Sequence, residues 1–217
     1  MAMNREYVPE SPLTPSGRAT YATLAELSWW AYETPETIHK QFPDAEFFNH
    51  IQSDTQFVAF PNQPHPGILA IAVRGTGVSS GWSWTDIFRN AKIFMRSWRG
   101  PKGTKVHRGY GDAVEAIQEI VENRIKGADR VIFTGHSLGG SVLTGILSYK
   151  ACVYRKIHGV SFGAPSFGNK KYYKSIQPRL HRVVFHNDIA PKHPRGWMSY
   201  YQPGRWRISH EGVITWG

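Results

Sequence analysis

Residues 131–140, Val-Ile-Phe-Thr-Gly-His-Ser-Leu-Gly-Gly, place a hydroxyl nucleophile among closely spaced glycines. Gly135, Ser137 and Gly139 form Gly-x-Ser-x-Gly, which lets a strand reverse sharply into a helix because Cβ atoms at the flanking positions would clash. Such a turn presents the serine Oγ above a helix N-terminus, whose free N–H groups stabilise developing negative charge. An ordinary turn serine also fits the motif. The apolar strand before it and the small-residue helix after it favour a nucleophilic Ser137.

A nucleophilic serine needs a general base, and the base needs an acid to orient it. Beyond the elbow only Asp188 and Glu211 are acidic. Asp188 follows a predicted strand at the end where active-site loops gather, although it could also serve as a turn or capping residue. His193 and His210 both follow Asp188. The order Ser, Asp, His predicts Asp188 as the acid and leaves both histidines open as the base.

The segments around these residues alternate between strand and helix periodicity. We predict helices over 19–32, 112–126, 139–149 and 169–177, and strands over 55–60, 68–73, 131–134, 156–162 and 182–186. This alternation predicts an α/β fold with a mostly parallel sheet and helices on its faces. Residues 1–18 are rich in Pro and Ser and predict a flexible N-terminal arm, so that 19–217 form one domain.

Five segments together resemble the class 3, fungal-type lipase family. They are 71–76 (Ile-Ala-Val-Arg-Gly-Thr), 84–86 (Trp-Thr-Asp), 106–110 (Val-His-Arg-Gly-Tyr), 135–140 and 162–169 (Phe-Gly-Ala-Pro-Ser-Phe-Gly-Asn). The resemblance implies a minimal α/β-hydrolase domain whose mostly parallel central sheet is flanked by helices. It also implies a Ser137–Asp188–His210 triad, because the family's base follows its last strand, which residues 200–207 resemble. The backbone N–H groups of Thr76 and Leu138 would form the oxyanion hole, without metal or other cofactor.

The activity implied is that of a triacylglycerol lipase or carboxylesterase, which cleaves acyl-lipid esters through an acyl-enzyme. An esterase for soluble or polymer-linked short-chain or aromatic esters is the alternative. By resemblance, residues 77–105 include the lid over the acyl pocket, where Trp82, Trp84, Ile87 and Phe88 would contact substrate. From Ile87 to Gly111 seven Lys or Arg residues occur without any acidic residue. These features predict either contact with an anionic membrane surface or a partly buried aromatic set beneath a solvated charged face.

The composition admits another class of function. With 26 Lys or Arg and 16 Asp or Glu, the formal net charge is +10, which attracts polyanions. Nucleic-acid binding is therefore an alternative, but no nucleic-acid-binding motif is present and no nucleic-acid partner is expected. A catalytically inactive binding protein is disfavoured because all three triad residue types are present. The ten histidines lack metal-ligand spacing, and His107 and His136 are interpreted as structural.

The chain carries few signals about its compartment. Cys152 is its single cysteine, so no intramolecular disulfide can form. The polar N-terminus lacks the apolar stretch of a secretory signal, and no run of about 18 apolar residues exists to span a membrane. We therefore expect a cytoplasmic rather than a secreted protein. The oligomeric state is not predicted.

Overall fold

The computed structural model describes residues 21–75, 94–176, 179–185, 187–194, 199–201, 203, 206–208 and 214–216. The helices are α1 (Tyr21–Trp30), α2 (Pro35–Gln41), α4 (Arg108–Ala116), α5 (Gln118–Ile125), α6 (Ser137–Ile146), α7 (Lys150–Tyr154) and α8 (Lys170–Ile176), with 3-10 helices η2 (Ile51–Ser53) and η5 (Ala190–Lys192). The strands are β1 (Glu46–His50), β2 (Thr55–Pro61), β3 (Ile68–Arg74), β4 (Met95–Ser97), β5 (Lys105–His107), β6 (Arg130–His136), β7 (His158–Phe162), β8 (Leu180–Phe185), β9 (Trp206–Ile208) and β10 (Ile214–Trp216). The expected arm at 1–18 lies outside the described residues.

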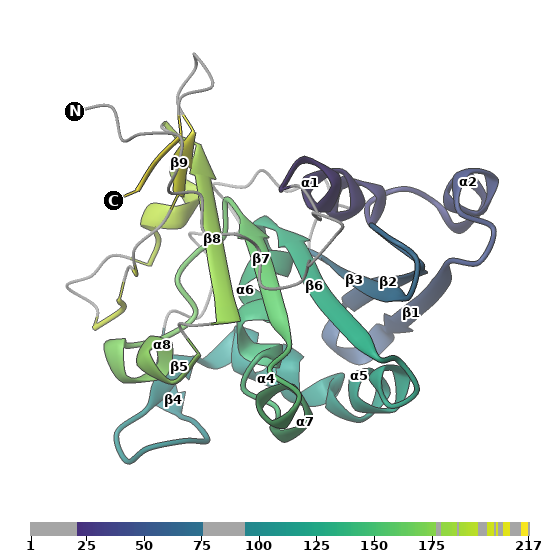
Figure 1. The fold of residues 1–217 in the computed structure, drawn as a ribbon. Coiled ribbons are helices and arrows are strands. Elements are labelled where there is room, and N and C mark those ends of the chain that lie inside the picture. The colour runs from purple at the N-terminus through teal and green to yellow at the C-terminus, as the bar shows by residue number, and fades with distance from the viewer. Residues whose placement is uncertain are drawn as a thin grey trace.

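The described strands form a central sheet with the order β1-β2-β3-β6-β7-β8-β9-β10. Figure 1 shows this sheet with its strands labelled from β1 to β9. The run from β3 through β6, β7 and β8 to β9 is parallel, whereas β1, β2 and β10 pair antiparallel at the two sides. The prediction of a mostly parallel sheet is thus confirmed. Strands β4 and β5 form a separate hairpin. No described helix is long and apolar enough to cross a membrane.

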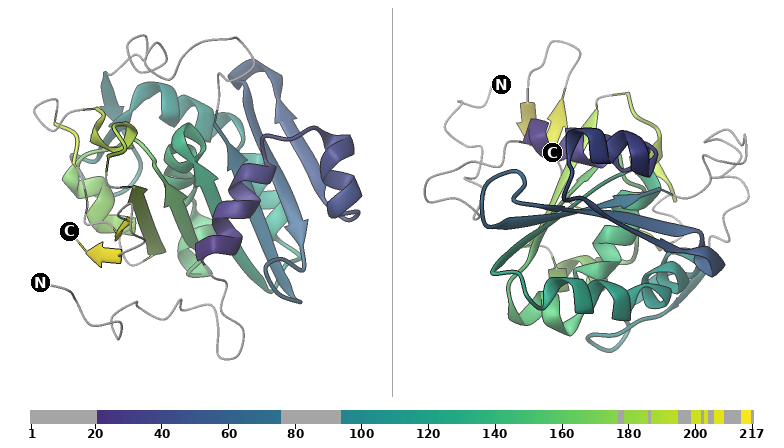
Figure 2. Two further views of the ribbon diagram at one scale, coloured as in Figure 1. Left: turned by 90° about the horizontal axis from the view of Figure 1, so that it is seen from above. Right: turned by 90° about the vertical axis from the view of Figure 1, so that its right-hand side faces the viewer.

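Each face of the sheet is covered by helices, and the side chains of β3 show how the two faces are built. Ile68, Ala70 and Ala72 join the apolar cluster of α1, whereas Leu69, Ile71 and Val73 join the cluster of α4, α5 and α6. Figure 2 shows the sheet edge-on between these two layers. A strand buried on both faces reads as a continuous apolar run, and this explains why residues 68–73 lack polar alternation. Truncating a fully buried side chain of such a core costs about 2–5 kcal/mol.

The helix predicted at 112–126 is two helices in the structure. Val114, Ile117, Val121 and Ile125 are all buried, so the apolar stripe is correct. The backbone of Ile117 leaves the helical region (φ −103°, ψ 2°), which separates α4 from α5. Helix α4 also begins four residues earlier than predicted, at Arg108, because the side chain of the preceding His107 caps it. The helix start was missed because histidine is not a usual N-cap residue.

His107 is structural, in keeping with the interpretation from the sequence. Its Nδ1 accepts a hydrogen bond from the backbone N–H of Tyr110 at 3.3 Å, and its ring stacks on the Tyr110 ring with centroids 3.9 Å apart. Because Nδ1 accepts, the proton of the neutral ring is on Nε2, which has no partner among the described atoms. Burial lowers the pKa of His107 to about 4. The ring is therefore neutral in the folded protein at pH 7.

We expect the protein to lose stability as the pH falls from about 6.5 towards 4. The folded-state pKa of His107 lies below its unfolded value of about 6.5, so the unfolded chain binds the proton first. The contribution of neutral His107 to the free energy of unfolding is therefore fully present above about pH 6.5. Between pH 7 and pH 5, protonation of His107 alone should lower the free energy of unfolding by about 2 kcal/mol. Urea unfolding at the two pH values measures the difference. His107→Asn keeps a capping side chain but removes the titrating ring, so an unchanged pH dependence in this variant would contradict the assignment.

Candidate active site

Ser137 lies at the junction of β6 and α6. Its φ of +52° is the left-handed conformation that non-glycine residues rarely adopt, and its side chain is buried. Ser137 is the first residue of α6, so the strand turns into the helix at the serine itself. A strained backbone at one hydroxyl residue between a buried strand and a buried helix is the geometry of a nucleophile elbow.

The glycines of the elbow allow α6 to lie against the ends of two strands. A Cβ at Gly139 would overlap the carbonyl oxygen of Val73 at the end of β3. A Cβ at Gly135 would lie 2.8 Å from the carbonyl carbon of Gly139. Both approaches involve backbone atoms, which cannot rotate away. The chain therefore requires glycine at both positions of Gly-x-Ser-x-Gly, as the sequence predicted.

The predicted oxyanion hole is partly within the described residues. Leu138 is buried directly after Ser137. The position of a Cβ at Gly75 would be 3.3 Å from the Gly139 nitrogen and 3.4 Å from the Leu138 Cβ, so the end of β3 lies against the start of α6. Thr76, the other predicted donor, follows Gly75 in the chain but lies outside the described residues.

Tyr32 is a contributor that the sequence did not reveal. Its hydroxyl oxygen accepts a hydrogen bond from the Gly75 N–H and donates one to the carbonyl oxygen of His136, each at 3.3 Å. One hydroxyl therefore joins the chain just before Thr76 to the residue just before Ser137. These contacts span 43 and 104 residues of sequence, so no local pattern could have indicated them.

Asp188 lies beyond β8, as predicted, and its two carboxylate oxygens have different surroundings. Oδ1 accepts a hydrogen bond from the Ala190 N–H at 2.9 Å, so the residue does support a turn. Oδ2 faces Gly163, where a Cβ would lie only 2.6 Å from it. Gly163 has φ +58°, and its N–H donates to the Val183 carbonyl at 2.9 Å. The turn role and a catalytic role are compatible because they use different oxygens.

The structure describes His193 and His136 but not His210. His210 lies outside the described residues. The backbone of His193 is fixed, because its carbonyl accepts from the Ser166 N–H at 2.7 Å. His136 lies near Asp188: burial lowers the pKa of His136, and the Asp188 carboxylate opposes that shift. The His136 ring also packs edge-on against Tyr32, with centroids 6.1 Å apart, which agrees with the structural role inferred from the sequence.

Trp82, Trp84, Ile87 and Phe88, the predicted lid residues, lie outside the described residues. The basic aromatic segment is described from Phe94 onward, and there the structure distinguishes its members. Trp98 is buried, and the guanidinium carbons of Arg96 and Arg99 each lie 4.8 Å from its ring centroid. Arg96 also pairs with Glu115 at 2.7 Å. Trp98 and its two arginines are thus part of the packed structure, whereas Phe94 is exposed.

The described residues contain no group of three or more His, Cys, Asp or Glu side chains that could hold a metal ion. Cys152 is buried, and burial raises the pKa of its thiol to about 12. It is therefore protonated at neutral pH and a poor nucleophile. Ser199 also has a positive φ (68°), but Ser137 combines a left-handed φ with a position between a buried strand and a buried helix.

A comparison with family models matches residues 70–197, more than half of the chain, to the family described as lipase (class 3). The chain belongs to the class 3 lipase family. The matched range contains the end of β3, the elbow and Asp188. It ends before His210, so the family match does not extend to that candidate base.

Three curated relatives match parts of the chain. The chain is 34% identical over 120 residues to a secreted mono- and diacylglycerol lipase of Malassezia globosa, covering 49% of this chain and 39% of the relative. It is 28% identical over 196 residues to a lipase of Rhizopus niveus, covering 82% and 46%. It is 29% identical over 103 residues to phospholipase A1-II 5 of Oryza sativa subsp. indica, covering 42% and 22%. The chain thus spans less than half of the length of these curated relatives.

Solved structures of fungal lipases share the fold. Lipase II from Rhizopus niveus has a TM-score of 0.70 at 19% identity, with 92% of this chain and 86% of that chain covered. The lipase from Rhizopus microsporus var. chinensis has a TM-score of 0.70 at 21% identity, covering 96% and 84%. The α/β-hydrolase fold expected from the sequence is confirmed.

The expectation of a cytoplasmic protein is wrong. The Malassezia globosa relative is a secreted lipase, which contradicts a preference for the cytoplasm. The reasoning failed because a single cysteine excludes only an intramolecular disulfide. A folded α/β-hydrolase with a buried core does not need disulfides for stability, so their absence says little about compartment.

Proposed function

We propose that this chain is a serine carboxylic-ester hydrolase that cleaves acyl lipids through an acyl-enzyme, as a triacylglycerol lipase or carboxylesterase does. The observation that carries the proposal is the left-handed φ of +52° at Ser137, on a turn that glycine alone permits. The close approach of Gly75 to Leu138 supports an oxyanion hole on the same side of the turn. Membership of the class 3 lipase family supports the substrate class.

The proposed mechanism has two half-reactions. His210, oriented by Asp188, takes the proton of Ser137 while Oγ attacks the ester carbonyl carbon. The N–H groups of Leu138 and Thr76 stabilise the oxyanion of the tetrahedral intermediate. Collapse breaks the C–O bond, and His210 protonates the departing alcohol. Water, deprotonated by His210, then attacks the acyl-enzyme and releases the carboxylic acid and free Ser137.

The substrate class is proposed from the relatives. Their names include a mono- and diacylglycerol lipase and a phospholipase A1, so both neutral and phosphorylated glycerolipids are candidates. A phospholipid interface is supported by the exposed Phe94, which lies within residues 77–105, the basic segment in which the lid is predicted. An esterase for soluble short-chain or aromatic esters differs in needing no interface.

We would test the proposal with p-nitrophenyl esters from acetate to palmitate, with and without vesicles containing phosphatidylglycerol. A lipase should hydrolyse the long-chain esters, and anionic vesicles should raise the rate more than phosphatidylcholine vesicles do. Activity on short chains alone would support the soluble esterase instead. No hydrolysis of any ester by the folded protein would refute the proposal.

The base is tested by comparing His210→Ala with His193→Ala. We expect His210→Ala to lower kcat by at least ~10³-fold with little change in KM, because the base acts in the transition state rather than in binding. His193→Ala should retain most activity, since the main-chain bond of His193 to Ser166 does not require its side chain. The reverse result would assign the base to His193.

Gly163 should be essential for placing the Asp188 carboxylate. In Gly163→Ala the new Cβ would lie 2.6 Å from Oδ2, so the carboxylate must move away from its present position. A displacement of about 1 Å at a catalytic group costs on the order of 100-fold in rate, so kcat should fall by about that factor. Steady-state kinetics measures it.

The matched control is Gly67→Ala, which imposes backbone strain without a catalytic clash. Gly67 has φ +75°, and its Cβ would meet only Arg130 Nη2 at an ordinary 3.5 Å. Both variants should lose about 1–2 kcal/mol of stability, because alanine is strained in the left-handed region. An equal rate in the two variants would show that Gly163 does not position Asp188 for catalysis.

A further inference from the structure

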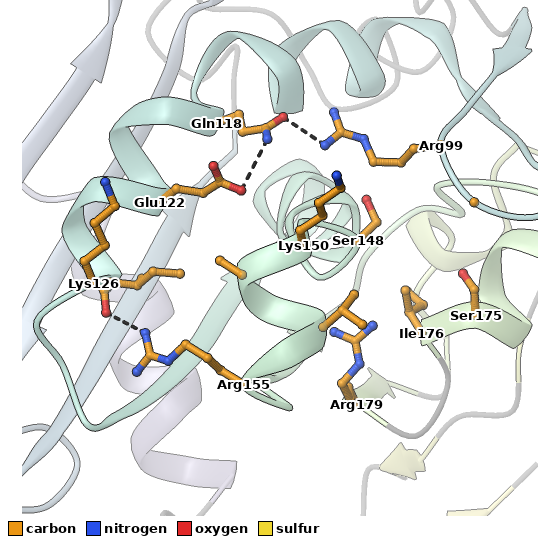
Figure 3. Close-up of a pocket in the computed structure, with 14 residues that line it drawn as sticks. Arg99, Gln118, Glu122, Lys126, Ser148, Lys150, Arg155, Ser175, Ile176 and Arg179 are labelled. Atoms are coloured by element: carbon orange, nitrogen blue, oxygen red, sulfur yellow. Dashed lines mark hydrogen bonds between the residues drawn. The ribbon is translucent and has the colours of Figure 1, made fainter.

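A cavity of about 900 Å³ lies at the end of the sheet opposite Ser137. Its lining comes from α5, α7, α8 and the turns after β4 and α6, and Figure 3 shows the labelled side chains around it. Strands β6 and β8 begin beside it, since Lys126 and Arg179 line it shortly before those strands start. Ser137 follows the other end of the seven-residue β6, so about 20 Å of strand separates the two sites.

The lining is strongly cationic. It includes five basic side chains and one carboxylate, and these are Arg99, Lys126, Lys150, Arg155, Arg179 and Glu122. Two of the basic side chains form hydrogen bonds that support the fold. Arg155 donates to the carbonyls of Ile125 and Ala128 and so caps α5, and Arg99 donates to Gln118 at 2.8 Å. Their charge still contributes to the potential inside the cavity.

Lys150 and Arg179 have no anionic partner within the described part of the chain. Arg179 is only 8% exposed, and its Nη1 donates to the Leu147 carbonyl at 2.6 Å, an uncharged acceptor. Burial lowers the pKa of Arg179, which reflects the cost of holding its charge away from water. The Lys150 ammonium forms no hydrogen bond or ion pair with the described residues, and the side chain is exposed. A buried guanidinium and an exposed ammonium that line the same cavity both attract an oxyanion.

The rest of the lining combines four apolar side chains with Gly100, Gln118, Ser148 and Ser175. The four apolar residues are Ile125, Ala151, Val153 and Ile176, of which Ile125 and Ile176 are buried and Val153 is 48% exposed. A small inorganic anion would leave the exposed surface of Val153 in contact with water. A ligand with an alkyl chain would bury it, gaining roughly 25 cal/mol for each Å² removed from water.

From this arrangement we propose that the cavity binds an anionic amphiphile, with its phosphate or carboxylate head at Lys150, in the positive field to which Arg179 contributes, and its alkyl chain on Ala151 and Val153. The head group comes either from a phospholipid or from a free fatty acid, and both offer an oxyanion on an apolar chain. The site is separate from the ester-cleaving centre and does not depend on the activity proposed above. It is a second lipid contact at the opposite end of the sheet.

The test is isothermal titration of the full chain with octyl phosphate, octanoate, inorganic phosphate and neutral octyl glucoside. None of these contains a carboxylic ester, so catalysis cannot consume the probe. We expect octyl phosphate or octanoate to bind saturably at one site, at least about tenfold more tightly than inorganic phosphate. The stronger of the two probes identifies the phospholipid or the fatty-acid source. Equal affinity for octyl phosphate and inorganic phosphate would overturn the role of the alkyl chain.

Lys150→Glu tests the position of the head group. It should weaken binding of the anionic amphiphile by about tenfold, because it replaces a charge-assisted contact with repulsion. Lys40→Glu, at an exposed lysine of α2, makes the same change in net charge far from the cavity and should have less than about twofold effect. Lys150 is exposed, so neither variant threatens the fold. Unchanged binding in Lys150→Glu, or equal losses in both variants, would overturn the proposal.

Discussion

Ser137→Ala is expected to lower kcat/KM for ester hydrolysis by at least ~10⁴-fold, with no loss of stability. The variant lacks the nucleophile, and only the oxyanion donors and substrate binding would remain to assist attack by water. Alanine keeps the Cβ of serine, so the strained turn is preserved. A fluorophosphonate probe should label Ser137 in the wild-type chain and leave the variant unlabelled, as mass spectrometry of the labelled peptide would show.

Ser137→Gly separates the chemistry from the backbone strain. Glycine adopts φ near +52° without steric cost, so this variant should unfold at higher urea concentration than Ser137→Ala, by about 1 kcal/mol. Both variants should be equally inactive. If Ser137→Ala retained ester hydrolysis, or if the probe labelled another residue, the proposed nucleophile would be wrong.

Among single glycine-to-alanine substitutions in the described elbow, Gly139→Ala is expected to lower stability and activity the most. The added Cβ would overlap the carbonyl oxygen of Val73, and the nearby Arg74 and Gly75 backbone atoms would lie 2.8 Å from it. Because these atoms belong to the buried end of β3, α6 must move away from the strand. We expect a loss of about 3 kcal/mol or more in unfolding free energy, together with most of the activity. Urea unfolding and ester kinetics measure the two effects.

Gly127→Ala is the control for Gly139→Ala. Gly127 follows α5, and a Cβ there would meet no atom within 4 Å. The free energy of unfolding of Gly127→Ala should differ from that of the wild type by less than about 0.5 kcal/mol, and the activity of the variant should not change. A stable, active Gly139→Ala would show that the contact between α6 and β3 is not needed to form the site.

The strands that meet at the site were predictable because they are short apolar runs that end in turn-forming residues. Residues 55–60 and 68–73 correspond to β2 and β3, and the predicted 131–134 lies within β6. The elbow was predictable because glycine and serine at fixed spacing permit only a few backbone conformations. Helices α2 and α7 and strands β1 and β10 were missed, since each is short and mixes apolar with polar residues without a clear period.

The sequence alone determined the α/β fold class, the nucleophile candidate and the acid candidate, because these depend on periodicity, local backbone sterics and chain order. Only the tertiary structure decided which distant residues support them. Tyr32 joins the end of β3 to the end of β6, and Gly163 leaves room for Oδ2 of Asp188. It also decided that Trp98 is buried against two arginines and that cations from four separate segments line one cavity. These features arise from contacts between residues far apart in the chain, whose energies depend on distance and burial rather than on sequence neighbours.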